Sequence, residues 1–170
     1  MKKILQLLIL VTFSFNVLSQ NIIIEPDIKI DSTTLKINKL GYEYYAYNSY
    51  DNKKIDSLTI VIGTIGTSVT ALKINLTEPP EVYITLWSDY PEYDDKNALD
   101  VKLEYYDLTL NDTTFNKDDR VMGRIKGKSE PIKNNLGEYQ LEFDGEFSHI
   151  VGKLLIKRKA NQKYRILDNY

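Results

Sequence analysis

The feature that most constrains the fold is a regular alternation of apolar and polar residues in the segment Gly137–Lys159. A period of two is typical of a β-strand with one face against a core and the other toward solvent. The apolar face would carry Tyr139, Leu141, Phe143, Gly145, Phe147 and Val151, together with His149, the only histidine of the chain. This alternation predicts one long, half-buried strand.

The dipeptide Asp144-Gly145 offers an alternative in the middle of that segment, because Asp-Gly between apolar residues is a strong hairpin signal. A two-residue turn would place Glu146 opposite Phe143 and so bring a carboxylate onto the apolar face. A three-residue turn would pair Phe143 with Phe147. A continuous strand keeps every apolar residue in phase, with a bend or bulge at Gly145. We expect the continuous, bent strand.

The rest of the chain also has the composition of a β protein. It contains only four alanines, whereas isoleucine, valine, threonine and tyrosine are abundant. No clear amphipathic helix or internal repeat is visible, and short runs with strand character follow one another: Ile22–Ile30, Leu35–Ile37, Tyr42–Tyr50, Leu58–Ile62, Leu72–Leu76, Val82–Leu86, Leu99–Leu110, Val121–Gly127 and Leu154–Arg158. These runs predict an all-β fold, an antiparallel Greek-key β-sandwich of roughly 8–10 strands, with a small β-barrel as the alternative.

Three of these runs carry further local signals. We expect a turn at Asp51–Lys53, directly after Tyr42–Tyr50. Gly123 and Gly127 would allow close approach of a neighbouring strand. In Leu99–Leu110 the apolar residues change from odd to even positions, which predicts a bulge near Tyr106-Asp107. A short helix over 96–106 is the alternative there.

The first 19 residues have the order of parts found in a secretory signal peptide. These parts are the basic residues Lys2 and Lys3, the apolar run Ile4–Phe15, and a small-residue cleavage pattern at Val17 and Ser19. The apolar run is short for a membrane-spanning helix, and no stop-transfer segment follows it. We therefore expect a signal peptide, 1–19, and one β-sandwich domain, 20–170.

The absence of cysteine rules out a disulfide framework and a cysteine-linked lipid anchor. Export without cysteines favours a bacterial protein of the periplasm, the cell surface or the extracellular medium. The formal net charge is −2, and removal of Lys2 and Lys3 would lower it by two more charges. A nucleic-acid partner is not expected, because phosphate binding needs a concentrated basic surface.

Charge is distributed unevenly along the chain. Glu81–Asp119 holds 11 acidic residues against three lysines, whereas Ser148–Tyr170 holds six basic residues against Asp168 alone. We interpret this as solvated faces or as neighbouring strands of opposite sign, in preference to a dipole that binds a partner.

Recognisable catalytic motifs are missing from the sequence. Without cysteine, thiol nucleophiles and thiolate metal sites are excluded, and no serine-hydrolase elbow, zinc-protease motif or phosphate-binding loop is present. His149 falls on the apolar face of its strand, where we expect a buried, hydrogen-bonded histidine. No catalytic residue is predicted, although a glycosidase could draw a carboxylate pair from the 24 acidic residues.

Aromatic residues beside an acidic loop are the best candidates for a ligand site. Exposed rings with neighbouring carboxylates can stack on sugars or anchor a protein partner. The candidates are Tyr83, Trp87, Tyr90 and Tyr93, with a possible extension to Tyr42–Tyr50. The alternative is that tyrosine simply suits a strand, with its ring on the sheet and its hydroxyl in water.

The loop Ser88–Asp100 is also the best candidate for a metal site. It supplies the hard oxygen ligands that calcium prefers, from Asp89, Asp94, Asp95 and Asp100. Its spacing does not match an EF-hand, and acidic loops are commonly just solvated. Calcium is the only cofactor that the sequence suggests.

These observations indicate a class of function and no specific ligand. We expect an exported, non-catalytic binding or interaction module of a bacterial envelope, with an unidentified protein or glycan as partner. The alternatives are a small outer-membrane β-barrel and a carbohydrate-active enzyme that uses two carboxylates.

Overall fold

The computed structural model describes residues 20–54, 57–64, 66–90, 93, 96–134, 137–157, 159 and 161–168. Within these residues the chain forms fifteen β-strands and no helix. The predicted signal peptide, 1–19, lies outside the described residues. No helix in the described part of the chain is long and apolar enough to cross a membrane.

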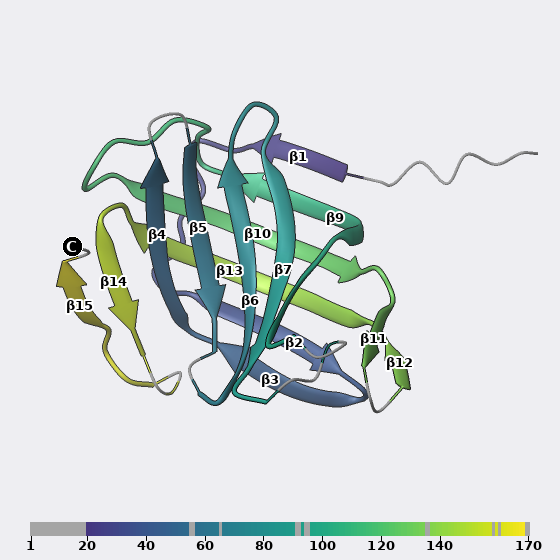
Figure 1. Ribbon diagram of the computed structural model, residues 1–170. Helices are drawn as coiled ribbons and strands as arrows, with labels where there is room; N and C mark the ends of the chain where they lie inside the picture. The colour runs from purple at the N-terminus through teal and green to yellow at the C-terminus, as the bar shows by residue number, and fades with distance from the viewer. Residues whose placement is uncertain are drawn as a thin grey trace, which may run out of the picture.

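Two large sheets face each other (Figure 1). The six-stranded sheet contains, in spatial order, β1 (Gln20–Ile24), β9 (Leu103–Leu110), β10 (Arg120–Ser129), β13 (Leu141–Ile150), β2 (Thr34–Lys39) and β3 (Tyr42–Ala46). The seven-stranded sheet contains β15 (Arg165–Asp168), β14 (Lys153–Ile156), β4 (Asn48–Lys54), β5 (Ser57–Gly63), β6 (Ser68–Leu76), β7 (Glu81–Ser88) and β8 (Ala98–Val101). A small hairpin of β11 (Ile132–Asn134) and β12 (Gly137–Tyr139) links β10 to β13.

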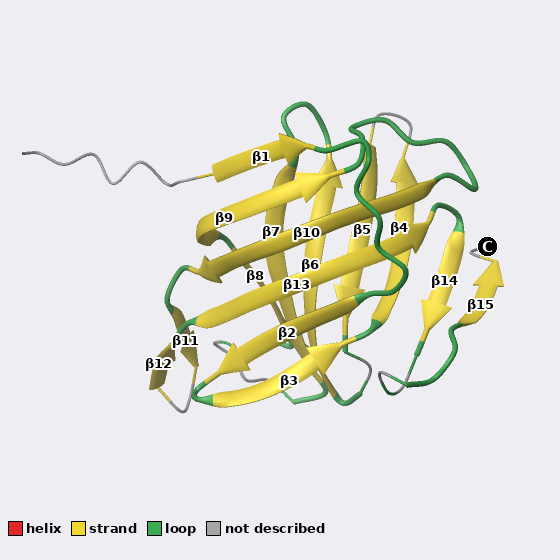
Figure 2. Ribbon diagram, turned by 180° about the vertical axis from the view of Figure 1, so that it is seen from behind, coloured by secondary structure: helices red, strands yellow, loops and turns green. Residues whose placement is uncertain are grey.

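The predicted all-β sandwich is confirmed. Every described strand pair is antiparallel except β1 and β9, which run parallel. Figure 2 shows the strands of the six-stranded sheet crossing steeply in front of those of the other sheet. Strands that bend from one sheet into the next form the corners of such crossed sandwiches. Here the chain passes between the sheets at Tyr47, between β3 and β4, and at Lys102, between β8 and β9.

The corner at Tyr47 corrects one local prediction. The expected turn at Asp51–Lys53 is wrong, because β4 continues to Lys54 and pairs there with Ser57. Asp51 belongs to the strand, with its side chain turned inward. Its polarity resembles that of a turn residue, but a partner from a distant strand allows it to be buried.

The predicted continuous strand through Gly145 is confirmed, but it is shorter than the alternating segment, because Tyr139 belongs to β12 and Val151 to the turn before β14. β13 runs through Gly145 without a turn, and Leu141, Phe143 and Phe147 on its inner face are buried. Together with β10 it forms the centre of the six-stranded sheet. Burial of each such side chain contributes about 1.5–3 kcal/mol.

Glycines make the close packing around this strand possible. Gly123 pairs directly with Phe147, and Gly127 with Phe143. A Cβ atom at Gly123 would lie 2.5 Å from a carbon of the Phe147 ring, and one at Gly127 would lie 2.6 Å from the Phe143 ring. The predicted close approach at these glycines is confirmed. At Gly145 an added Cβ would overlap the backbone carbonyl oxygen of Thr34 in β2.

The predicted phase change in Leu99–Leu110 is also present, but it lies nearer the corner at Lys102. Lys128 pairs with Tyr105 whereas Ser129 pairs with Leu103, which leaves Glu104 as the extra residue of the bulge. The alternative of a helix over 96–106 is wrong, because β8 and β9 occupy most of that range as strands in different sheets.

Substitution of Gly145 by alanine tests the close approach of β13 to β2. Because the new methyl group would overlap the Thr34 backbone, we expect the free energy of unfolding to fall by about 1–3 kcal/mol. Gly66→Ala is the matched control, since its Cβ would have no neighbour nearer than 3.9 Å. Urea unfolding of both variants measures the difference, and equal stability would contradict the close approach.

Candidate functional site

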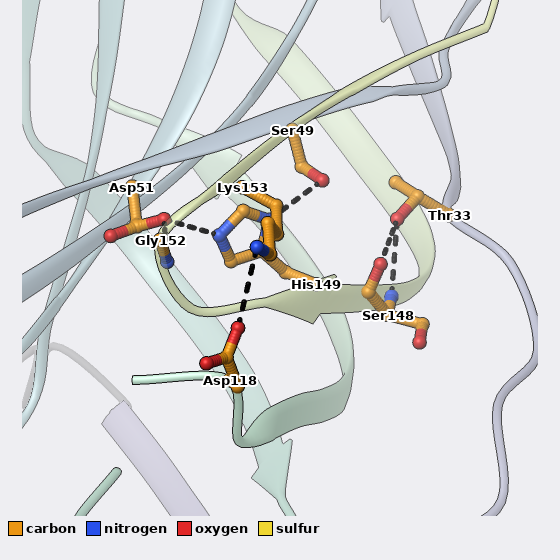
Figure 3. A network of polar contacts seen from close by, with 8 residues as sticks. All are labelled: Thr33, Ser49, Asp51, Asp118, Ser148, His149, Gly152 and Lys153. Carbon is orange, nitrogen blue, oxygen red and sulfur yellow. Dashed lines mark hydrogen bonds and ion pairs between the residues drawn. The ribbon is translucent and has the colours of Figure 1, made fainter. Parts of the chain in front are cut away.

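A buried polar network lies between the two sheets and is centred on His149 (Figure 3). The imidazole Nδ1 is 3.0 Å from the Ser49 hydroxyl, and Nε2 is 2.8 Å from Oδ1 of Asp51. Ser49 and Asp51 are two positions apart on β4, so both side chains point to its inner face. His149 comes from the inner face of β13, and its contacts therefore join the two sheets.

The protonation state of His149 follows from its surroundings. Burial lowers the pKa of the imidazole, and the opposing hydrogen bond and charge of Asp51 only partly offset this effect. A neutral ring satisfies both partners, with Nε2–H donating to Asp51 and Nδ1 accepting from Ser49. Asp51 Oδ1 also accepts a hydrogen bond of 2.8 Å from the backbone N–H of Gly152, which has a φ of 84° in the turn before β14.

The three side chains are the types found in serine hydrolases, but their arrangement does not support that chemistry. Ser49 and His149 have no exposed surface, so the hydroxyl cannot reach a substrate. The serine contacts Nδ1 and the aspartate contacts Nε2, which reverses the usual roles of the two nitrogens. The network is structural. The sequence indicated the burial of His149, but not its partners.

The network continues toward the C-terminal part of the chain. The Thr33 hydroxyl donates to the carbonyl of Ser148 and accepts from its N–H, both at 3.1 Å. It thereby replaces ladder hydrogen bonds where the pairing of β2 with β13 ends. The backbone N–H of Thr33 donates to the Tyr164 hydroxyl at 2.6 Å, and that hydroxyl donates to the Thr33 carbonyl at 3.2 Å. Tyr164 is therefore held in place by the buried network.

An ion pair at the edge of the network links the two segments of opposite charge. The Lys153 ammonium lies 3.4 Å from Asp118 and also pairs with Asp168 (Figure 3 shows the first contact). Asp118 comes from the acidic segment and Lys153 from the basic one. This contact agrees with the expectation that neighbouring segments of opposite sign offset each other.

A cleft of about 770 Å³ lies between the corner at Tyr47 and the C-terminal segment. Its volume is within the range of small-molecule sites. We call it the aromatic–basic cleft, after the residues that line it: Tyr45, Tyr47, Asn48, Thr64, Ile156, Lys157, Gln162, Lys163 and Arg165. The strands β14 and β15 on its C-terminal side lie beside β4 at one end of the molecule (Figure 1).

Lys157 is the most unusual residue of the cleft. It is only 6% exposed, and its ammonium lies 4.9 Å from the ring centre of Tyr164 and 5.7 Å from that of Tyr47. Its backbone N–H donates to the Asn48 side chain at 2.8 Å. Among the described residues no carboxylate pairs with the ammonium. Lysine is rarely buried without a counter-charge, and two aromatic rings replace only part of its hydration.

The remaining cleft residues add aromatic surface and positive charge. The rings of Tyr45 and Tyr47 are stacked, with centres 6.3 Å apart and planes 9° from parallel. Tyr45 keeps 45% of its surface exposed, and Lys163 and Arg165 are exposed at the rim. No acidic side chain is among the described lining residues. The described lining of the cleft is therefore positively charged.

The four aromatic residues predicted as a ligand site do not form one surface. Tyr83 and Trp87 share the outer face of β7, where the Lys73 ammonium lies 5.4 Å from the Tyr83 ring centre. Tyr90 is mostly exposed, whereas Tyr93 is 5% exposed and packs in the core. None of the four lines the aromatic–basic cleft. Two residues of Tyr42–Tyr50, the segment predicted as an extension of that site, do line the cleft: Tyr45 and Tyr47.

Two of the four predicted calcium ligands, Asp94 and Asp95, lie outside the described residues. Asp100 contacts the hydroxyl of Thr85 and lies 3.9 Å from the Lys73 ammonium. No group of three or more potential metal ligands from His, Asp and Glu is found in the described part of the chain. Calcium binding by this loop stays a prediction.

Comparison of the chain with protein-family models, curated proteins and solved structures finds no significant match. Function must therefore be inferred from the residues and their geometry.

The lowered pKa of His149 predicts a pH dependence of stability. In the unfolded chain His149 regains its ordinary pKa of 6.5, so the unfolded state binds the proton more readily as the pH falls. The stabilisation from neutral His149 is therefore present above about pH 6.5 and is lost below it, by up to about 1.4 kcal/mol per pH unit. Urea unfolding at pH 7.5 and 5.5 measures this loss.

The variant His149→Gln separates this effect from the titration of other groups. Glutamine cannot gain a proton, so the loss of stability between the two pH values should be smaller in the variant than in the natural protein. An equal loss in both proteins would contradict the assignment to His149.

Proposed function

We propose that the protein is an exported, non-catalytic binding module of a bacterial envelope, and that its ligand carries a negative charge held in the aromatic–basic cleft. The observation that supports this proposal is the largely buried side chain of Lys157, whose ammonium has ring faces beside it and no counter-charge among the described residues. Export is inferred from the signal-like residues 1–19.

The energetics of Lys157 favour a ligand over a purely structural role. Partial removal of an ammonium from water is unfavourable, and a cation–π contact returns only about 0.5–2 kcal/mol. An apolar residue of similar length would fill the same space without that cost. An incoming anion supplies the missing charge, and its attraction is strengthened because the surrounding side chains leave Lys157 little contact with water.

The lining of the cleft favours binding over hydrolysis. Glycoside hydrolysis needs two carboxyl groups on either side of the bond that breaks. The described residues of the cleft include neither a carboxylate nor a histidine, and the only other groups with polar hydrogens are amides, hydroxyls and cations. These groups recognise anions and hydroxyl-rich ligands without cleaving them.

Replacement of Lys157 by methionine tests the proposal, because methionine keeps the length and removes the charge. Calorimetric titration of the protein without the predicted signal peptide would use polygalacturonate, dextran sulfate, polyglutamate and inorganic phosphate as probes. We expect at least one probe to bind, and Lys157→Met to weaken that binding by about 10- to 100-fold. The variant should be as stable as the natural protein or more so.

Lys133→Met is the matched control. Lys133 is an exposed lysine on β11, at the opposite end of the molecule from β14 (Figure 1), and forms a surface pair of 3.5 Å with Glu138. Its replacement should leave the affinity unchanged. If no probe binds, or if Lys157→Met binds like the natural protein, the proposed function is wrong.

A further inference from the structure

The size of the aromatic–basic cleft requires a ligand larger than a simple ion. At about 30 Å³ per water molecule, a cleft of about 770 Å³ has room for roughly 25 waters. A single carboxylate, sulfate or phosphate would fill a small part of that space. The anionic group must therefore be attached to a larger body that covers the remaining walls.

The charges of the cleft favour a ligand with one negative charge at its innermost point. The two ring faces beside the Lys157 ammonium, those of Tyr47 and Tyr164, occupy part of its three donor directions. The single positive charge of Lys157 balances one singly charged group. Lys163 and Arg165 are exposed at the rim of the cleft and can attract further negative charges of an extended ligand. This attraction is weak, because salt screens charges that are exposed to solvent.

The stacked tyrosines favour a sugar ring as the larger body. An aromatic face carries partial negative charge, so it attracts the C–H groups that line one face of a pyranose. Tyr45 and Tyr47 lie nearly parallel, and Tyr45 is 45% exposed, which leaves aromatic surface open to a flat ligand. An acidic peptide would match the charge of the cleft, but its carboxylate side chains have no flat C–H face to stack on the rings of Tyr45 and Tyr47.

Polar groups for sugar hydroxyls are also present in the cleft. The Thr64 hydroxyl accepts a hydrogen bond of 3.1 Å from the N–H of Thr70 and keeps its own hydrogen free to donate. The Gln162 side chain is exposed at the rim, with both a donor and an acceptor. Sugar hydroxyls can use both kinds of group.

We propose that the aromatic–basic cleft binds an acidic saccharide, with the singly charged group of one sugar against Lys157 and its pyranose ring against the Tyr45–Tyr47 pair. This inference rests on the proposed function and names the class of ligand. Two kinds of ligand carry such a group, a singly charged oxyanion on a pyranose ring: uronic acids, through their carboxylate, and sugars with a sulfate ester.

Calorimetric titration of the exported protein with defined oligosaccharides tests the class of ligand. The probes are trigalacturonate, its carboxyl-reduced neutral form, a sulfated galactose trisaccharide and a triglutamate peptide. We expect at least one acidic trisaccharide to bind 10-fold or more tightly than both the neutral trisaccharide and the peptide. The preferred acidic sugar then distinguishes a carboxylate from a sulfate ligand.

Tyr45→Leu tests the stacking contact separately from the charge. Leucine keeps apolar surface but has no ring face, so we expect the affinity for the acidic trisaccharide to fall about 10-fold. Tyr50→Leu is the matched control, because Tyr50 is also 45% exposed and does not line the cleft. The control should bind like the natural protein.

The possible results separate this inference from the proposed function. The saccharide assignment would be wrong if the peptide and the acidic sugars bound equally well, or if Tyr45→Leu and Tyr50→Leu lost affinity to the same extent. Either result would leave Lys157-dependent anion binding intact. Absence of Lys157-dependent binding to any anionic probe would overturn both.

Discussion

The two hydrogen bonds of the His149 imidazole are the contact on which the rest of the structure depends. They join β13 at the centre of one sheet to β4 in the other, through Ser49 and Asp51. Apolar side chains fill the space between the sheets, but the hydrophobic effect that holds them there has no directional preference. A fully satisfied polar group in a low-dielectric interior fixes the relative position of its partners. The corner at Tyr47, two residues before Ser49, is thereby fixed as well.

Sequence reasoning succeeded where structure depends on local pattern. The period of two in β13 follows from burial of one face. The close approach at Gly123 and Gly127, opposite Phe147 and Phe143, was predicted because glycine within a strand leaves room for a neighbour. Sequence reasoning failed at Asp51, because the burial of that side chain depends on a histidine 98 positions later. The displaced bulge at Glu104 has a similar cause, since the sheet change at Lys102 is not encoded in the alternation.

The candidate site was hidden for the same reason. The sequence pointed to a basic C-terminal segment and to an aromatic segment at 42–50, but as separate features. Only the fold places the ring of Tyr47 beside Lys157 and adds that of Tyr164. A buried lysine has no sequence signature, because its burial comes from the residues that surround it and not from its neighbours in the chain.

The contact between Thr33 and Tyr164 has a consequence for the order of events during synthesis. It joins residues 131 positions apart, near the two ends of the described chain. A chain that emerges from its N-terminus can pair β4 to β8 early, since those strands are consecutive neighbours. The cleft needs the last residues as well. A chain that still lacks these residues therefore has no complete cleft, because one wall of it is formed by Ile156, Lys157, Gln162, Lys163 and Arg165.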